Sequence, residues 1–145
     1  CTETSTSFPE WIKQSEQDYK DMLDYLKAND FQAVCELTEA NALRMHQTTS
    51  TANPPFSYLT EASYQAMDKV KALRASGEQC YFTMDAGPNV KVLCRASDMG
   101  RLQKALSAHF PVEKIISSLP GPAAYVLSEA DWQQSKTRLT EGNHL

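Results

Sequence analysis

The sequence has few glycines, five among 145 residues, and they do not form a glycine-rich phosphate-binding loop. It also lacks the H-E-x-x-H motif of zinc peptidases and the G-x-S-x-G motif of serine hydrolases. These absences exclude the common nucleotide cradle and two common hydrolytic sites from this stretch of sequence.

The chain also lacks an excess of positive charge and a long apolar run. Its formal net charge is −4 and its pI is near 5.3, whereas nucleic-acid binders usually carry a basic face. No run of apolar residues is long enough to span a bilayer. We therefore expect neither nucleic acid nor a membrane among the partners.

The four cysteines form no C-x-x-C pair and have no histidine neighbours, so we expect no metal site. Cys35, Cys80 and Cys94 lie within apolar patterns, which predicts buried free thiols in a reducing, cytoplasmic compartment. Cys1 leaves two interpretations, a lipid-anchored N-terminus or a piece cut from a longer chain. The short polar stretch before the first helix makes a poor tether and disfavours the anchor.

What the sequence does contain is the pattern of one α+β domain over residues 1–145. Apolar residues recur at helical spacing over 8–27, where Ser7 and Glu10 predict a capping box. A second helix follows Asp30 and ends near His46, and the two are expected to pair as an antiparallel hairpin. The residues 47–56 predict an ordered loop because they are polar and then rich in proline.

The second half of the chain predicts four strands. A third helix ends near Gly77, and strands at 79–84 and 90–95 follow. Ser97 is expected to cap a short fourth helix, and strands are expected at 113–118 and 124–128. The tail 129–145 is expected to be helical around Trp132 and then to fray. This order predicts a ferredoxin-like, mostly antiparallel sheet with helices on one face.

Asp85 is the candidate catalytic residue, at the start of the turn D-A-G-P-N between the first two strands. Aspartate commonly opens turns because its carboxylate bonds nearby backbone N–H groups, so a purely structural role is one interpretation. The other is a general base, since Ala86 and Gly87 are small enough to let a ligand approach the backbone. Pro88 would stiffen the loop that holds the carboxylate.

Arg44, Met45 and His46 form a second candidate group at the end of the second helix. A histidine there usually interacts with the helix dipole. Met45 fits a core position, and Arg44 fits either a solvated helix position or an anion ligand. The alternative is that all three line a cleft together with the loop that follows.

Three stretches together resemble one family, the bacterial diphosphomevalonate decarboxylases of the GHMP kinase superfamily. They are NALRMHQTTSTANPPFSYL (41–59), CYFTMDAGPNVKVL (80–93) and SFPEWIKQSEQDYKDML (7–23). The resemblance covers residues 2–118 and is to the C-terminal half of these enzymes. It implies the fold of a GHMP kinase C-terminal domain.

The resemblance implies a reaction of the mevalonate pathway of isoprenoid and sterol biosynthesis. Mevalonate 5-diphosphate and ATP, with Mg²⁺, would give isopentenyl diphosphate, ADP, phosphate and carbon dioxide. Asp85 would take up or orient the proton of the 3-hydroxyl group, and the backbone of Ala86 and Gly87 would approach the substrate. Arg44, Met45 and His46 would line the cleft. Family members are commonly homodimers.

One departure from the family is decisive, because the N-terminal half of these enzymes has no counterpart in the sequence. That missing domain is expected to bind most of the ATP and Mg²⁺, so the 145 residues alone are expected to be inactive. Two enzyme alternatives are a related GHMP small-molecule kinase and a phosphomevalonate decarboxylase. A non-catalytic ferredoxin-like binding module is the third, and it would be favoured by a buried Asp85 bonded only within its turn.

Overall fold

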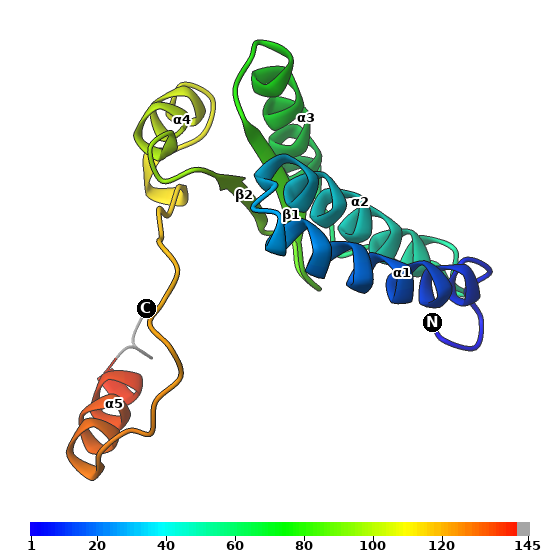
Figure 1. The fold of residues 1–145 in the computed structure, drawn as a ribbon. Helices are drawn as coiled ribbons and strands as arrows, with labels where there is room; N and C mark the ends of the chain where they lie inside the picture. Colours follow the sequence, from blue (N-terminus) through cyan, green and yellow to red (C-terminus); the bar gives the residue numbers. More distant parts are fainter. Residues whose placement is uncertain (142–145) are drawn as a thin grey trace.

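The computed structural model describes residues 1–141, and it begins with a helical hairpin (Figure 1). Helices α1 (Phe8–Lys27) and α2 (Phe31–Ser50) run antiparallel, as predicted. The start of α1 after Ser7 is confirmed, but the predicted capping box is wrong. The Ser7 hydroxyl instead shares a hydrogen bond with the Thr51 hydroxyl, 2.7 Å away, and so ties the start of α1 to the end of α2.

The link between these helices follows from local chemistry. Asn29 has a φ of 53°, a left-handed conformation that asparagine tolerates at the end of a helix. Asp30 then caps α2, because its carboxylate accepts a hydrogen bond from the Ala33 backbone at 3.0 Å.

Helix α2 is longer than predicted and extends four residues beyond His46, so the predicted start of the loop at residue 47 is wrong. The hydroxyl groups of Thr48, Thr49 and Ser50 explain the difference. Each donates to the backbone carbonyl three residues earlier, at 2.7–3.0 Å. These polar side chains are thereby satisfied inside a helix rather than in a loop.

Helix α3 (Glu61–Ala75) begins with a capping box formed by Thr60 and Ser63. Its buried side includes Met67 and Val70, as the apolar spacing predicts. The helix is followed by Gly77 at a φ of 103°, the left-handed conformation that favours glycine at this position.

The two strands β1 (Cys80–Met84) and β2 (Val90–Cys94) form an antiparallel hairpin close to the predicted limits. Phe82 lies opposite Val92. Alternate side chains of β1 point to the same side and form the core with α3 and with parts of α2 and α4. The buried members of this core are Ala42, Met67, Val70, Cys80, Phe82, Met84 and Leu102.

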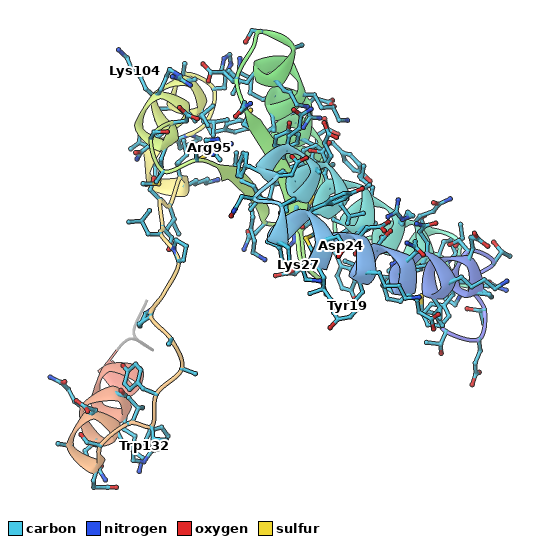
Figure 2. All side chains as sticks on the ribbon, in the orientation of Figure 1. Tyr19, Asp24, Lys27, Arg95, Lys104 and Trp132 are labelled. Atoms are coloured by element: carbon cyan, nitrogen blue, oxygen red, sulfur yellow. The ribbon has the colours of Figure 1, made fainter. Side chains whose placement is uncertain are left out.

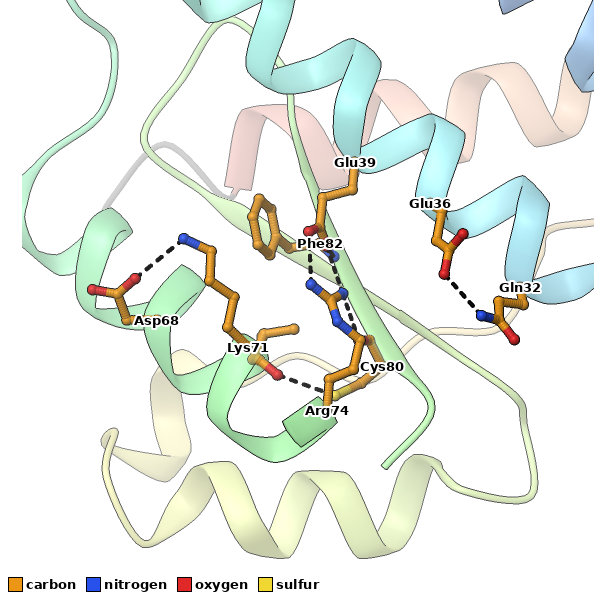
Figure 3. Close-up of polar contacts among 9 residues, drawn as sticks. Gln32, Glu36, Glu39, Asp68, Lys71, Arg74, Cys80 and Phe82 are labelled. Atoms are coloured by element: carbon orange, nitrogen blue, oxygen red, sulfur yellow. Dashed lines mark hydrogen bonds and ion pairs between the residues drawn. The ribbon is translucent and has the colours of Figure 1, made fainter. Parts of the chain in front are cut away.

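The outer edge of β1 is covered by an ion pair (Figure 3). Glu39 of α2 bonds both terminal nitrogens of the Arg74 guanidinium, each at 2.9 Å, and also accepts the Phe82 N–H at 3.1 Å. Arg74 in turn donates to the carbonyl oxygen of Cys80 at 3.2 Å. Two backbone groups that would otherwise be exposed at a strand edge are therefore paired with side chains.

Helix α4 (Met99–Ser107) follows the hairpin and buries Leu102. The predicted cap at Ser97 is wrong by one position, since Asp98 is the residue before the helix. Its carboxylate does not cap the backbone. It pairs instead with the guanidinium of Arg101 at 3.2 Å.

The predicted strands at 113–118 and 124–128 are wrong, because the structure has a short 3₁₀ helix η1 (Val112–Lys114) followed by irregular chain up to α5 (Glu129–Glu141). The α+β class is confirmed, but the sheet has two strands within residues 1–141 rather than four. Helix α5, which carries Trp132, lies apart from the rest of the molecule (Figures 1 and 2). The last four residues of the predicted tail, 142–145, lie outside the described part.

Candidate functional site

Asp85 follows the last paired residue of β1 and begins the tight turn to β2. Its backbone carbonyl accepts the Gly87 N–H at 2.8 Å. Its side chain is 80% exposed and pairs with the ammonium group of Lys91 on β2. A side chain added at Gly87 would meet nothing within 4 Å, so the turn leaves its backbone accessible. The carboxylate therefore points into open space beside an accessible backbone.

The turn borders an open groove of about 410 Å³ between α1, α2 and the end of β1. Asp85 is one of its lining residues, and Met45 contributes to its apolar wall. The other lining residues are Ser15, Asp18, Tyr19, Met22, Leu37, Thr38, Asn41, Ala42, Thr83 and Met84. Because Asp85 is open to a concave surface, its placement favours the enzyme interpretation over a carboxylate buried within its turn.

A buried carboxylate lies in the wall of the same groove. Asp18 of α1 is 5% exposed and accepts hydrogen bonds from Gln14 at 2.9 Å, from Asn41 at 2.7 Å and from the guanidinium of Arg44. Burial alone would raise the pKa of this carboxyl, but the hydrogen bonds from Asn41, Gln14 and Arg44 outweigh it and lower the pKa below 3.8. Asp18 is therefore ionised at neutral pH and holds the two helices together.

The three candidates at the end of α2 do not form one cluster. The side chain of Arg44 is 33% exposed and is engaged by Asp18, whereas Met45 lines the groove. His46 does not line this groove and is 7% exposed. The guanidinium of Arg44 is thus already neutralised by a carboxylate on the neighbouring helix.

His46 lies between the loop after α2 and the D-A-G-P-N turn. Its ring packs edge-to-face on Tyr58, with 6.3 Å between centroids. Neither ring nitrogen has a hydrogen-bond partner of ordinary geometry. Burial lowers the pKa of His46 below 6.5, and the nearby backbone of Asp85 opposes this shift. The imidazole is therefore neutral at pH 7.

Sequence reasoning missed Asp18, Asn41 and Lys91. For Lys91 a signal existed, because the predicted hairpin brings the first residue after β1 close to the second residue of β2. Asp18 and Asn41 could have been found only from the exact register of the helical hairpin. A polar residue on an amphipathic helix is usually solvated, so the pattern of these helices gives no sign of either residue.

Within residues 1–141, no three histidine, cysteine or acidic side chains come together in a way that could hold a metal ion. Over the same residues, no helix is both long and apolar enough to cross a bilayer. This part of the chain therefore offers no metal centre of its own.

Comparison with known proteins gives one consistent family. The model of the mevalonate 5-diphosphate decarboxylase C-terminal domain matches residues 1–142. The solved mevalonate pyrophosphate decarboxylase from Streptococcus pyogenes is 61% identical and has a TM-score of 0.73, with 76% of this chain and 35% of that chain covered.

Two further relatives extend this result. A structure of MDDEF in complex with MVAPP, AMPPCP and magnesium is 45% identical, with a TM-score of 0.78 over 79% of this chain and 35% of that one. The diphosphomevalonate decarboxylase of Rattus norvegicus is 30% identical over 94 residues, which are 63% of this chain and 23% of the relative. The chain thus spans about a third of these solved relatives and about a quarter of the rat protein.

Proposed function

Because the chain belongs to the mevalonate 5-diphosphate decarboxylase C-terminal domain family, we propose that it forms the C-terminal part of an ATP-dependent decarboxylase. The substrate is mevalonate 5-diphosphate and the product is isopentenyl diphosphate. The observation that carries this proposal beyond family membership is the placement of Asp85, which is exposed, lines a groove and lies on a turn with an open backbone.

In this proposal Asp85 is the catalytic residue. Its carboxylate takes up or orients the proton of the 3-hydroxyl group while that oxygen is phosphorylated. An exposed carboxylate can reach a substrate proton directly, as a general base must. The ion pair with Lys91 directs the carboxylate along the hairpin. The open backbone at Ala86 and Gly87 lets the mevalonate part of the substrate approach closely.

The other candidates have smaller roles in the proposal. Met45 supplies an apolar wall to the substrate, since it lines the groove. Arg44 contacts the substrate only if its guanidinium is shared with Asp18, which holds it at present. His46 is placed behind the turn rather than in the groove, so any influence on the substrate passes through the backbone of Asp85.

ATP and Mg²⁺ are assigned to a separate N-terminal domain. Support comes from the solved relative that binds AMPPCP and magnesium and is about three times as long as the matched region. In this proposal the 145 residues alone are inactive, and the full-length enzyme is a cytoplasmic homodimer.

Two enzyme alternatives share the same fold and would use the same turn. A GHMP small-molecule kinase would stop at the phosphorylated product, and a phosphomevalonate decarboxylase would accept a monophosphate. Carbon dioxide release with the diphosphate and not with the monophosphate distinguishes the proposed enzyme from both.

The test is turnover by a protein that spans the length of the relatives and contains this chain. Carbon dioxide and ADP are measured with mevalonate 5-diphosphate for the wild type and for Asp85→Asn, which removes the charge at nearly constant size. We expect a loss of about 10²–10⁴-fold in kcat. The matched control is Asp68→Asn, because Asp68 is also exposed and paired with a lysine, Lys71 at 3.3 Å. If both variants keep wild-type turnover, Asp85 is a turn residue and the catalytic assignment is wrong.

A further inference from the structure

We infer that Ser63 of α3 is a positioning residue for the D-A-G-P-N turn. Ser63 is 2% exposed, and its hydroxyl donates to the backbone carbonyl of Pro88 at 2.6 Å. The turn that carries Asp85 is thereby attached at its far end to the first turn of a long helix. This inference rests on the proposed role of Asp85, but the contact itself can be tested separately.

The Ser63 hydroxyl is fully used at this position. It accepts from the backbone N–H and from the hydroxyl of Thr60, both at 3.1 Å, and donates to Pro88. A serine hydroxyl has a single proton to donate, so its orientation toward Pro88 is fixed by these partners. The capping box of α3 therefore serves both to start the helix and to hold the turn.

The turn has little packing to hold it otherwise. Ala86 and Pro88 are exposed, and the space next to Gly87 is open. The near end is restrained by the bond from the Gly87 N–H to the Asp85 carbonyl, and buried His46 lies behind that carbonyl. With so few contacts, loss of one strong hydrogen bond should move the turn, because an exposed loop has no close-packed neighbours to keep it in place.

A matched pair of variants separates the turn contact from the helix cap. Ser63→Ala removes the turn contact and one of the two bonds of the cap, since the Ser63 hydroxyl takes part in both. Thr60→Ala removes the other bond of the cap and the contact between the Thr60 and Ser63 hydroxyls at 3.1 Å. It leaves the Ser63 hydroxyl in place to donate to Pro88, which the Thr60 side chain does not touch. Ser63→Cys nearly keeps the size of the buried side chain and replaces a strong donor with a weak one.

The first measurement is amide hydrogen exchange on the 145-residue chain, in which the first turn of α3 reports on the helix cap and Gly87 reports on the turn. We expect faster exchange at that helix end in both alanine variants. At the Gly87 amide we expect exchange about tenfold faster or more in Ser63→Ala, a smaller increase in Ser63→Cys, and no change in Thr60→Ala. Equal exchange at Gly87 in all of them would overturn the inference, and so would equal acceleration by Thr60→Ala and Ser63→Ala.

The second measurement is turnover in the longer protein. Ser63→Ala should lower kcat by up to about 10²-fold with little change in KM, because a small displacement of a reacting group can cost that much. Thr60→Ala should stay near the wild type. Absence of turnover in the wild type would contradict the proposed function, whereas the exchange result would still decide the contact. Wild-type kcat in Ser63→Ala would overturn the positioning role.

Discussion

The part of the chain up to α4 and the segment after it behave in opposite ways. In the first part, here called the body (residues 5–107), helices and hairpin share one core, in which Phe82 is 0% exposed. In the second, here called the C-terminal segment (residues 108–141), most apolar side chains of residues 108–136 are exposed, and Val126 is 96% exposed. Both contain apolar and β-branched residues. What differs is whether these side chains pack against other apolar side chains.

This difference shows that a β-strand cannot be read from its own residues alone. The residues 80–84 and 90–94 are adjacent across a tight turn, so each supplies the other with a hydrogen-bonded partner. The residues 113–118 have similar side chains but no strand beside them in the structure. Strand propensity mostly reflects packing on a half-buried surface, and without that surface it has little effect.

The largest effect we predict comes from removing a core side chain of the body. Phe82→Ala should lower the free energy of unfolding by about 3–5 kcal/mol, because it deletes a fully buried ring and leaves a cavity. The matched change in the C-terminal segment, Val126→Ala, should lie within about 0.5 kcal/mol of the wild type. Urea denaturation measures both. Similar losses for the two variants would remove the distinction between the regions.

The sequence was most informative where the signal is local. The turn at Asn29 and Asp30, the cap of α2 and the limits of β1 and β2 are decided by residues close to one another in the chain. The sequence was misleading where a distant residue competes for a side chain. The Ser7 hydroxyl, for example, bonds Thr51 rather than its own helix.

The second largest effect on stability is expected at Asp18, the buried carboxylate that joins α1 to α2. Asp18→Asn should cost about 2–3 kcal/mol, less than the full value for a buried pair because Arg44 is partly solvated. The control is Asp24→Asn, since Asp24 is 76% exposed and pairs with Lys27 on the outer surface of α1 (Figure 2). This control should change stability by less than about 1 kcal/mol. Equal losses would mean that burial adds nothing to the Asp18 interaction.

The same residue predicts a dependence of stability on pH. The pKa of Asp18 is lowered on folding by its hydrogen bonds, so the native state binds this proton less tightly than the unfolded chain does. The contribution of Asp18 to the free energy of unfolding is therefore complete above the unfolded pKa, near 3.8. It is lost as the pH falls through the lower pKa of the folded state. Asp18→Asn should flatten the loss of stability below pH 4, as acid titration followed by circular dichroism would show. An unchanged acid transition would contradict this assignment.

Much of the candidate site could be predicted for the same reason that the hairpin could. Asp85 and its turn depend on residues in direct sequence, and their placement at a strand end was predicted. The environment of Asp85 could not be predicted in this way. The groove needs the register of α1 against α2, and the contact from Ser63 to Pro88 joins residues 25 positions apart.

The third effect concerns the edge of β1. Glu39→Gln should cost about 1 kcal/mol, because the amide oxygen can still accept the Phe82 N–H while the ion pair with Arg74 is lost. Glu36→Gln is the control, since Glu36 lies one turn earlier on α2 and bonds only the exposed Gln32 in Figure 3. The control should lie within about 0.5 kcal/mol of the wild type in chemical denaturation. A control that costs as much as Glu39→Gln would show that the strand edge gains nothing from the ion pair.

The smallest effect is expected from deletion of residues 119–145. The described side chains of 119–134 are all exposed, including Leu119 and Trp132, and α5 lies away from the body in Figure 1. Tolerance of a deletion depends on the burial and bonding of what is removed. We therefore expect the free energy of unfolding to change by no more than about 0.5 kcal/mol, the range typical of changes at solvated positions. Urea denaturation of the shortened chain, with Phe82→Ala as the sensitive reference, measures it. A loss of stability close to that of Phe82→Ala would show that the C-terminal segment packs on the body in solution. The apolar side chains of both regions would then have packing partners, and the contrast between the regions would not hold.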